Sequence, residues 1–231
     1  MERSLQRDES YQPIRKAVRL VYVLTGIGLA VRGFYRRDLY KFMLSLSTLL
    51  LVPGIELIRR WTRWKGGWQM ETYIYGFSLL GWTLGGAAAW YARFPGYDKL
   101  VHCLSGVFVS LLILVIYRVL ENDPEHHRSN PAMESFFVFF GSMAVAGLFE
   151  LCEFTLSSIT GRDLQHVLDT GVTDTMGDMF VCMLGTLFLL ALLHRARHGK
   201  PDVLTDAVDA FVRPNLPFEL PAQIFHRDRM K

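Results

Sequence analysis

The sequence predicts an all-α fold, a polytopic membrane bundle of about six transmembrane helices. Of the 231 residues, 51% are hydrophobic, and the mean hydropathy is positive. The apolar residues gather in blocks of about 15–22 residues, the length that crosses a bilayer as a helix. We therefore expect one helical membrane domain rather than a soluble core.

Charge and cysteine usage agree with this class. The net charge is only +3, and the basic residues lie beside the apolar blocks, which favours membrane orientation and argues against nucleic-acid binding. The three cysteines, Cys103, Cys152 and Cys182, fall inside apolar blocks, so no disulfide framework is predicted.

Residues 1–16 are polar and basic and are expected to form a cytoplasmic N-terminal segment before a transmembrane domain at 17–195. They lack the small-residue pattern of a signal cleavage site, so the first apolar segment is expected to be retained. That segment has only about 12 residues between Arg19 and Arg32, less than a helix needs to cross the hydrocarbon core. It is either a short span whose arginines reach the interface or an interfacial helix.

The next two spans are predicted at 39–58 and 73–91. Pro53 should kink the second span near its end, because proline removes a helix hydrogen bond. Basic residues and tryptophans follow at 59–68 and indicate a membrane surface. The third span is uncharged, and its Gly81 and Gly85 form a face that lets another helix approach closely.

Three further spans are predicted at 97–120, 135–154 and 175–193. Gly141 and Gly147 give the fifth span a small-residue face suited to close packing. Polar connectors are expected at 121–134, where His126 and His127 should be solvated, and at 155–175. Residues 196–231 should form a partly ordered cytoplasmic tail with one weakly amphipathic stretch at 202–212.

Six spans put both chain ends on one side of the membrane. Lys and Arg residues near the spans number about 14 on that side and about 7 on the other, so the positive-inside rule places both termini in the cytoplasm. The first hairpin argues the other way, because Arg32, Arg36, Arg37 and Lys41 lie on the opposite side.

Ionisable residues lie where the fourth, fifth and sixth spans reach one membrane face. Alternating helix direction brings these three ends to one depth, whichever side is cytoplasmic. Each span supplies a pair spaced three or four residues apart and so on one helix face. The pairs are Asp98 and His102, Glu150 and Glu153, and Asp174 and Asp178.

So many carboxylates at low dielectric need cations, protons or basic partners. The six residues are therefore candidate metal ligands. Carboxylate oxygens suit Mg²⁺, Mn²⁺ or Ca²⁺, and the imidazole admits Mn²⁺, Fe²⁺ or Zn²⁺. Glu150 and Glu153 are the candidate catalytic residues, with a spare carboxylate as general base. Arg93, Arg162 and His166 are near enough in sequence to bind an anionic head group.

The same residues also allow interpretations that involve no metal and no catalysis. Asp98 and Asp174 lie near helix N-termini, where the helix dipole favours a carboxylate facing interfacial water, and His102 alone suits helix packing. Glu150 and Glu153 are harder to explain in this way, because they are expected at a helix C-terminal end, and Asp178 lies deeper than a cap. Together the residues favour a polar site.

Three stretches carry a resemblance to a known family. The stretches YDKLVHCLSG at 97–106, LFELCEF at 148–154 and DTGVTDTMGDM at 169–179, followed by Gly185, resemble the YjdF-like family of small bacterial inner-membrane proteins. The likeness covers about residues 73–193 and implies a polytopic membrane protein with the same six site positions, together with Thr175 and Met179. A more distant likeness is to VanZ-like proteins. Asp169 stands in a run that departs from the family's Gln-Gly-Asp pattern, which leaves its role open.

Three functions remain open from the sequence. The first is a metal-dependent intramembrane enzyme that acts on a lipid or lipid-linked head group. The second is a cation or proton transporter, and the third is a non-catalytic membrane factor with a structural polar layer. The apolar stretches beyond the acidic layer, such as 107–117, argue against a transport path. Membrane lipid is the expected partner, and a helix–helix oligomer is left open.

Overall fold

The computed structural model describes residues 2–122, 130–165 and 167–216. Within these ranges the chain is helical without a strand, which confirms the all-α prediction. The elements are α1 (Glu2–Tyr35), α2 (Leu39–Leu49), α3 (Leu51–Thr62), α4 (Trp68–Ser78), the π-helix η1 (Leu79–Ala87), α5 (Trp90–Arg93), α6 (Tyr97–Glu121), α7 (Pro131–Thr160), α8 (Val167–Thr170), α9 (Thr173–Arg197), α10 (Val203–Val212) and the 3₁₀ turn η2 (Arg213–Asn215).

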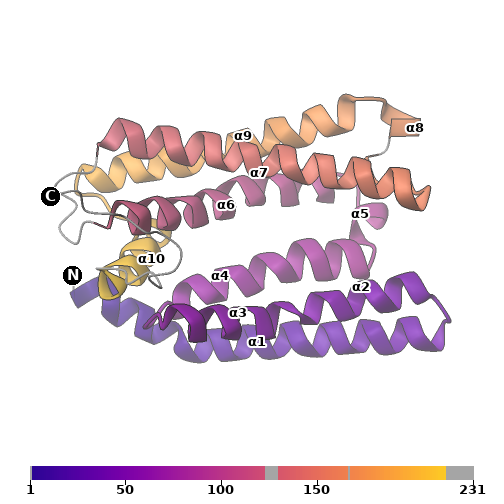
Figure 1. Cartoon of the computed structure of the whole chain (residues 1–231), viewed down its shortest axis with the longest axis horizontal. Helices are drawn as coiled ribbons and strands as arrows, with labels where there is room; N and C mark the ends of the chain where they lie inside the picture. The colour runs from indigo at the N-terminus through magenta and orange to yellow at the C-terminus, as the bar shows by residue number, and fades with distance from the viewer. Residues whose placement is uncertain (1, 123–129, 166, 217–231) are drawn as a thin grey trace, which may run out of the picture.

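The long helices form two layers (Figure 1). One layer holds α1 to α4 and the other holds α6, α7 and α9, with α10 between them at the end where α1 begins and α9 finishes. We call this the termini end, and the opposite end, where α6 and α9 begin and α7 finishes, the site end. Among the described residues, five helical segments are long and apolar enough to cross a membrane: Ser4–Tyr35, Leu39–Thr62, Tyr97–Glu121, Pro131–Thr160 and Thr173–Arg197. The predicted third span corresponds to α4 and η1, consecutive helices of 11 and 9 residues.

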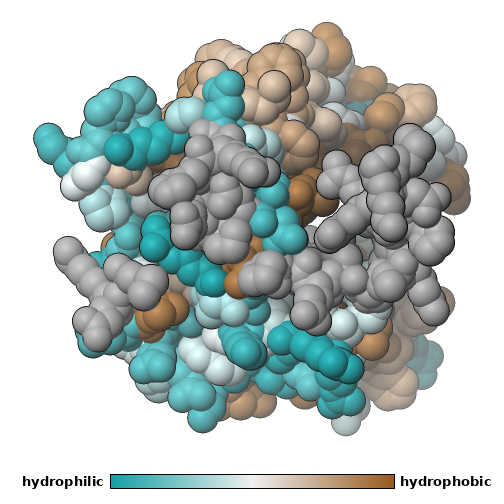
Figure 2. All heavy atoms as spheres, turned by 60° about the vertical axis from the view of Figure 1, so that its left-hand side comes forward, coloured by the Kyte–Doolittle hydropathy of each residue, from teal (hydrophilic) through white to brown (hydrophobic). Residues whose placement is uncertain are grey.

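The outer faces of these helices are apolar, as contact with lipid requires. Large hydrophobic side chains are exposed along α1, α7 and α9, among them Leu24, Phe140 and Phe188. Figure 2 turns the termini end toward the viewer: hydrophilic residues cover much of it, and hydrophobic residues continue along its flanks. This distribution supports a chain that contacts membrane lipid on its long sides.

Helix α1 is much longer than the apolar segment that the sequence showed. It has 34 residues, because the polar residues before Arg19 belong to the same helix. They are held by the neighbouring α4: both Asp8 carboxylate oxygens accept backbone N–H bonds of 2.9 Å from Gly67 and Gln69 at the start of that helix. The first apolar segment is thus part of a helix long enough to span.

Buried ion pairs at the termini end were not predicted from the sequence. Glu71 is 2% exposed and pairs with Arg15 at 2.8 Å and with Arg59. Glu134 accepts from Arg118 at 2.8 Å and from Arg197 at 2.5 Å, which joins α6, α7 and α9. Paired charges tolerate burial, so these contacts fix how the helices meet at this end.

The predicted kink at Pro53 is present as a break between α2 and α3 at Leu50. Proline has no N–H for the carbonyl four residues earlier, and its ring crowds that carbonyl, so the helix is interrupted before Pro53 rather than at it. The Leu50 N–H turns back to the Ser47 carbonyl at 3.2 Å, and the helix resumes at Leu51.

Helix α7 continues to Thr160, six residues past the predicted end of its span, so Glu150 and Glu153 lie well inside the helix. The expectation that they stand at a helix C-terminal end was wrong. The polar run after Phe154 stays helical because its hydroxyls bond to carbonyls four residues earlier, as Thr155 does to Leu151 at 2.7 Å. Gly161, with φ of 67°, ends the helix.

The amphipathic stretch of the tail forms α10, which packs between α1, α4 and α6. Val208 and Val212 are fully buried there, and Arg118 bonds to Asp209 at 2.5 Å. A capping box begins the helix. The Asp202 side chain accepts hydrogen bonds from the Leu204 and Thr205 N–H groups, and the Thr205 hydroxyl oxygen accepts one from the Asp202 backbone N–H.

We expect Asp202→Ala to destabilise α10 by about 1 kcal/mol, because the substitution leaves first-turn N–H groups without an acceptor. Hydrogen exchange of the purified protein should show faster opening of α10 amides. Lys200→Ala, at an exposed position before the helix, is the control. Equal exchange in both variants would contradict the capping role.

Candidate functional site

Three helix ends meet at the site end. Asp98 and His102 lie in the first two turns of α6, and Asp174 and Asp178 lie in the first two turns of α9. The side chains of these four residues gather in one cluster, which we call the acidic cluster. The alternating direction of the spanning helices predicted this proximity.

A close crossing of α6 and α9 sets the separation of the two helices. Gly106 of α6 and Gly185 of α9 stand where the backbones touch: a Cβ at either position would lie 2.0 Å from a carbonyl oxygen of the opposite helix, at Cys182 and Cys103 respectively. Only glycine fits at both points. Of the packing glycines predicted from the sequence, Gly85 meets Tyr91 and Gly141 meets Ile113, whereas Gly147 has nothing within 4 Å.

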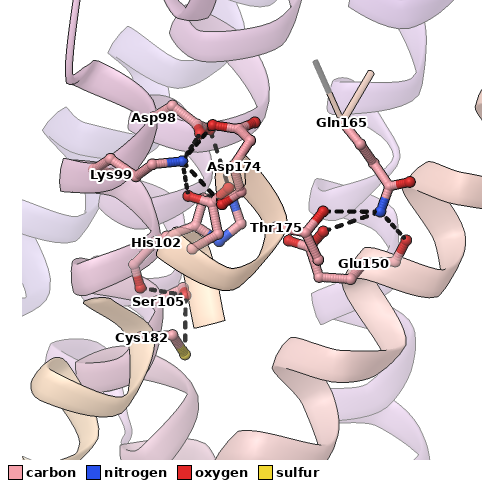
Figure 3. Close-up of polar contacts among 10 residues, drawn as sticks. Asp98, Lys99, His102, Ser105, Glu150, Gln165, Asp174, Thr175 and Cys182 are labelled. Carbon is pink, nitrogen blue, oxygen red and sulfur yellow. Dashed lines mark hydrogen bonds and ion pairs between the residues drawn. The ribbon is translucent and has the colours of Figure 1, made fainter. Parts of the chain in front are cut away.

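Lys99 stands at the centre of the acidic cluster (Figure 3). Its Nζ lies 2.5 Å from Asp174 Oδ1, 2.8 Å from Asp178 Oδ1 and 3.4 Å from Asp98 Oδ2, and it also donates to the Asp174 carbonyl at 3.2 Å. The sequence predicted cations, protons or basic partners for these carboxylates without identifying Lys99 as one. Its position next to Asp98 did not identify it, because consecutive residues point about 100° apart around a helix.

His102, one helical turn further along α6 than Asp98, completes the cluster. Its side chain is 13% exposed, and its Nε2 lies 3.5 Å from Asp98 Oδ1 and 3.9 Å from Asp178 Oδ1. The ring also packs edge-on against Phe149 of α7, with 5.6 Å between ring centroids. The histidine is therefore held by packing in an orientation that faces two carboxylates.

Glu150 belongs to a neighbouring group rather than to the acidic cluster itself. Gln165, buried in the connector before α8, donates 3.2 Å bonds from Nε2 to the Glu150 carbonyl, to Glu150 Oε2 and to the Thr175 hydroxyl (Figure 3). The other oxygen, Oε1, is buried and finds no donor among the described residues. A buried carboxylate oxygen without a donor is costly, so this oxygen favours a cation or a proton.

The remaining candidate residues lie outside the acidic cluster. Glu153 is half-buried on α7, within electrostatic reach of Asp98 and Asp178. Asp169 is exposed in α8, and Arg162 stacks over the Tyr40 ring with 3.7 Å to its centroid. Arg93 is exposed, and its binding of an anionic head group stays a prediction. His166, His126 and His127 lie outside the described residues.

The geometry of the acidic cluster fits a divalent metal ion. One ligand atom each from Asp98, His102 and Asp178 lies within 4.8 Å of the other two. Ligands about 2.0–2.3 Å from a shared ion are themselves about 3–4.5 Å apart, so small side-chain adjustments would close the site. The three carboxylates of the cluster outnumber its one lysine, so the cluster keeps an excess of negative charge. Lys99 would have to yield Asp178 Oδ1 to the ion, since its Nζ occupies that oxygen at 2.8 Å.

The comparisons with known proteins place the chain in a family. Residues 17–199 match a family model described as "Predicted membrane protein (DUF2238)". No curated protein and no solved structure matches the chain. Because the match covers most of the chain, the protein belongs to this family, in agreement with the resemblance seen in its sequence.

Proposed function

We propose that this member of a family of predicted membrane proteins binds a divalent metal ion at the acidic cluster and acts on a lipid or lipid-linked head group. The observation that carries the proposal is the convergence of Asp98, His102 and Asp178 from two helices, with their ligand atoms within 4.8 Å of one another. Oxygen ligands with one imidazole suit Mg²⁺, Mn²⁺ or Zn²⁺.

The proposed roles follow from position. Asp98, His102 and Asp178 hold the ion, with Asp174 beside them. A bound divalent ion supplies a Lewis acid for a phosphoryl or ester oxygen. Glu150 is fixed by Gln165 at the edge of the site, and Glu153, one helical turn further along α7, serves as the general base that takes a proton from water.

The membrane setting supports a lipid substrate. The cluster lies at the site end, where the spanning helices begin or end, and is only partly covered: the Asp98 side chain is 31% exposed. We place the chain in a bacterial inner membrane with both termini cytoplasmic, on the residue resemblance and on the distribution of basic residues. The cluster would then face the outer side.

The two other functions have less support. A carrier needs a polar path across the bundle, yet beyond the cluster the interior of α6 and α9 holds the fully buried Leu111, Leu114 and Leu189, next to the uncharged hydroxyls of Ser110 and Thr186. A purely structural layer is favoured by the contacts of Lys99 with three carboxylates. It leaves the buried Oε1 of Glu150 unexplained.

Release of head groups tests the proposal. Purified protein in mixed micelles of phospholipid, with Mg²⁺, Mn²⁺ or Zn²⁺ added in turn, should release head group or phosphate. Glu153→Gln should lower the rate by about 10²–10⁴-fold, as loss of a general base does, without loss of metal. Asp169→Asn, at the exposed carboxylate of α8, should leave the rate unchanged. Release that is absent with all three ions, or equal in Glu153→Gln and wild type, would contradict the enzymatic role.

A further inference from the structure

A small cavity lies at the site end, on the layer that holds α1 and α2. It has a volume of ≈ 60 Å³ and opens at the turn between these two helices, with Ala87 and Ala88 at the end of η1 on one wall. Three basic side chains line it: Arg32, Arg36 and Lys41. None of them belongs to the acidic cluster or to the ion pairs of the termini end.

Short contacts hold the backbone around this cavity. Gly33 of α1 stands directly against α2, where an added Cβ would lie 2.8 Å from the Phe42 backbone nitrogen. The Asp38 N–H donates to the Gly33 carbonyl at 3.0 Å, and Asp38 Oδ1 accepts the Lys41 backbone N–H at 3.0 Å. The positions from which the basic side chains reach the cavity are therefore set before a ligand arrives, which lowers the cost of binding one.

The protein does not neutralise the positive charge of the cavity. Within the described ranges, the side chains of Arg32, Arg36 and Lys41 form no hydrogen bond or ion pair. Arg32 and Arg36 are four residues apart, a spacing at which like charges repel on a helix. Asp38 supplies one carboxylate among the lining residues, so the cavity keeps a net charge of about +2.

Helix dipoles account for only part of this charge. Arg32 lies in the last turn of α1, and Arg36 directly follows that helix, so the negative end of its dipole favours both. Lys41 lies in the first turn of α2, where the dipole disfavours a cation. A bound anion would remove this conflict and the repulsion between the two arginines.

The size and charge of the cavity select the ligand. About 10–15 Å³ of such volume holds one water molecule, so ≈ 60 Å³ suits a group of a few heavy atoms and excludes a hydrocarbon chain. The phosphate of a monoester is a group of this size, carries a charge of about −1.5 to −2 at pH 7, and offers three acceptor oxygens to arginine forks. A phosphodiester has a single negative charge and fewer free oxygens.

We propose that this cavity binds the phosphate group of a phosphate monoester. Arg32, Arg36 and Lys41 would donate to its oxygens, while Asp38 keeps the start of α2 in place. The head group of phosphatidic acid and soluble phosphate share this chemistry, and their binding can be separated by experiment. The site is distinct from the acidic cluster, and the inference does not rest on metal binding or catalysis there.

The test uses the full chain in detergent and one matched pair of variants. Arg36 lines the cavity, while Arg37, next in sequence, is exposed and does not. Isothermal titration measures the affinity for inorganic phosphate, and native mass spectrometry measures that for phosphatidic acid. At least one of the two should bind wild type, and its affinity should fall at least about tenfold in Arg36→Gln and stay within about twofold in Arg37→Gln.

A second variant and a second lipid complete the test. Lys41→Gln should weaken binding as Arg36→Gln does, although it leaves both arginines in place. Phosphatidylglycerol, a diester, should bind wild type more weakly than phosphatidic acid does. Tighter binding of phosphatidic acid than of inorganic phosphate would identify a lipid head group as the ligand, and the reverse order would identify a soluble one; either supports the site.

Three results would overturn the proposal. The first is a wild-type protein that binds neither inorganic phosphate nor phosphatidic acid. The second is equal affinity in Arg36→Gln, Arg37→Gln and wild type, because the cavity would then not be where the ligand binds. The third is equal binding of phosphatidylglycerol and phosphatidic acid, because the cavity would then not select a monoester.

Discussion

Gly185→Ala should be among the most damaging single-methyl substitutions in this protein. The added Cβ would lie 2.0 Å from the Cys103 carbonyl oxygen, and that atom belongs to the backbone of α6 and cannot turn away. The helices would have to separate along their whole contact. We expect a cost at or above the upper end of the about 1–3 kcal/mol typical of overpacking. The midpoint of thermal unfolding in detergent, followed by size-exclusion fluorescence, measures it.

The control substitution, Gly147→Ala, should change the stability in the opposite direction. Gly147 lies inside α7 and has nothing within 4 Å of its ideal Cβ, so Gly147→Ala meets no clash and gains helix propensity of about 0.5–1 kcal/mol. Gly106→Ala should behave like Gly185→Ala, because it meets the Cys182 carbonyl oxygen at the same distance. If Gly185→Ala and Gly147→Ala unfold at the same temperature, the α6–α9 crossing does not have the closeness described.

The second large effect concerns Lys99. Lys99→Gln should lower the stability of the metal-free protein and raise its affinity for a divalent ion at least about tenfold, or about 1.4 kcal/mol. Its Nζ contacts three carboxylates, so its loss leaves them repelling one another. The same loss frees Asp178 Oδ1 and removes a positive charge beside the ion. Two unit charges 4 Å apart interact by about 4 kcal/mol at an effective dielectric constant of 20, so a tenfold gain is a modest expectation.

Isothermal titration with Mn²⁺ and thermal unfolding with and without the ion measure both effects. Arg37→Gln removes one exposed cation at the same end of the bundle and should change neither quantity appreciably. A Lys99→Gln protein that is destabilised and not rescued by any divalent ion would instead support a structural polar layer, with the lysine as its essential counter-ion.

The fold was predictable where hydrophobic blocks have lengths that match the membrane. Helices α6 and α9 lie close to their predicted spans, because charged or polar residues bound each apolar run. The end of α7 was missed because Thr and Ser are typical of helix ends, yet their hydroxyls here bond within the helix. Helix α1 was judged by its apolar part alone, and contacts from residues far away in the sequence, such as those of Asp8 with α4, hold the rest.

The candidate site was likewise predictable only in part. The proximity of Asp98, His102, Asp174 and Asp178 follows from helix direction and spacing, and local sequence contains both. The central place of Lys99 depends on how α6 faces α9, which is set by the Gly106–Gly185 crossing. The role of Gln165 depends on how the connector folds back onto α7 and α9. A small residue in an apolar block gives no sign of its partner, so this geometry could not be predicted from one sequence.

The measurement that tests the central claim most directly is the metal content of detergent-purified wild type, Asp178→Asn and His102→Ala, after incubation with Mg²⁺, Mn²⁺ and Zn²⁺ and removal of free ions. We expect close to one divalent ion per chain in wild type and its loss in both variants, with unfolding curves showing that the variants remain folded. A folded wild-type protein that retains none of the three ions would contradict the metal site and leave Lys99 as the counter-ion of the cluster.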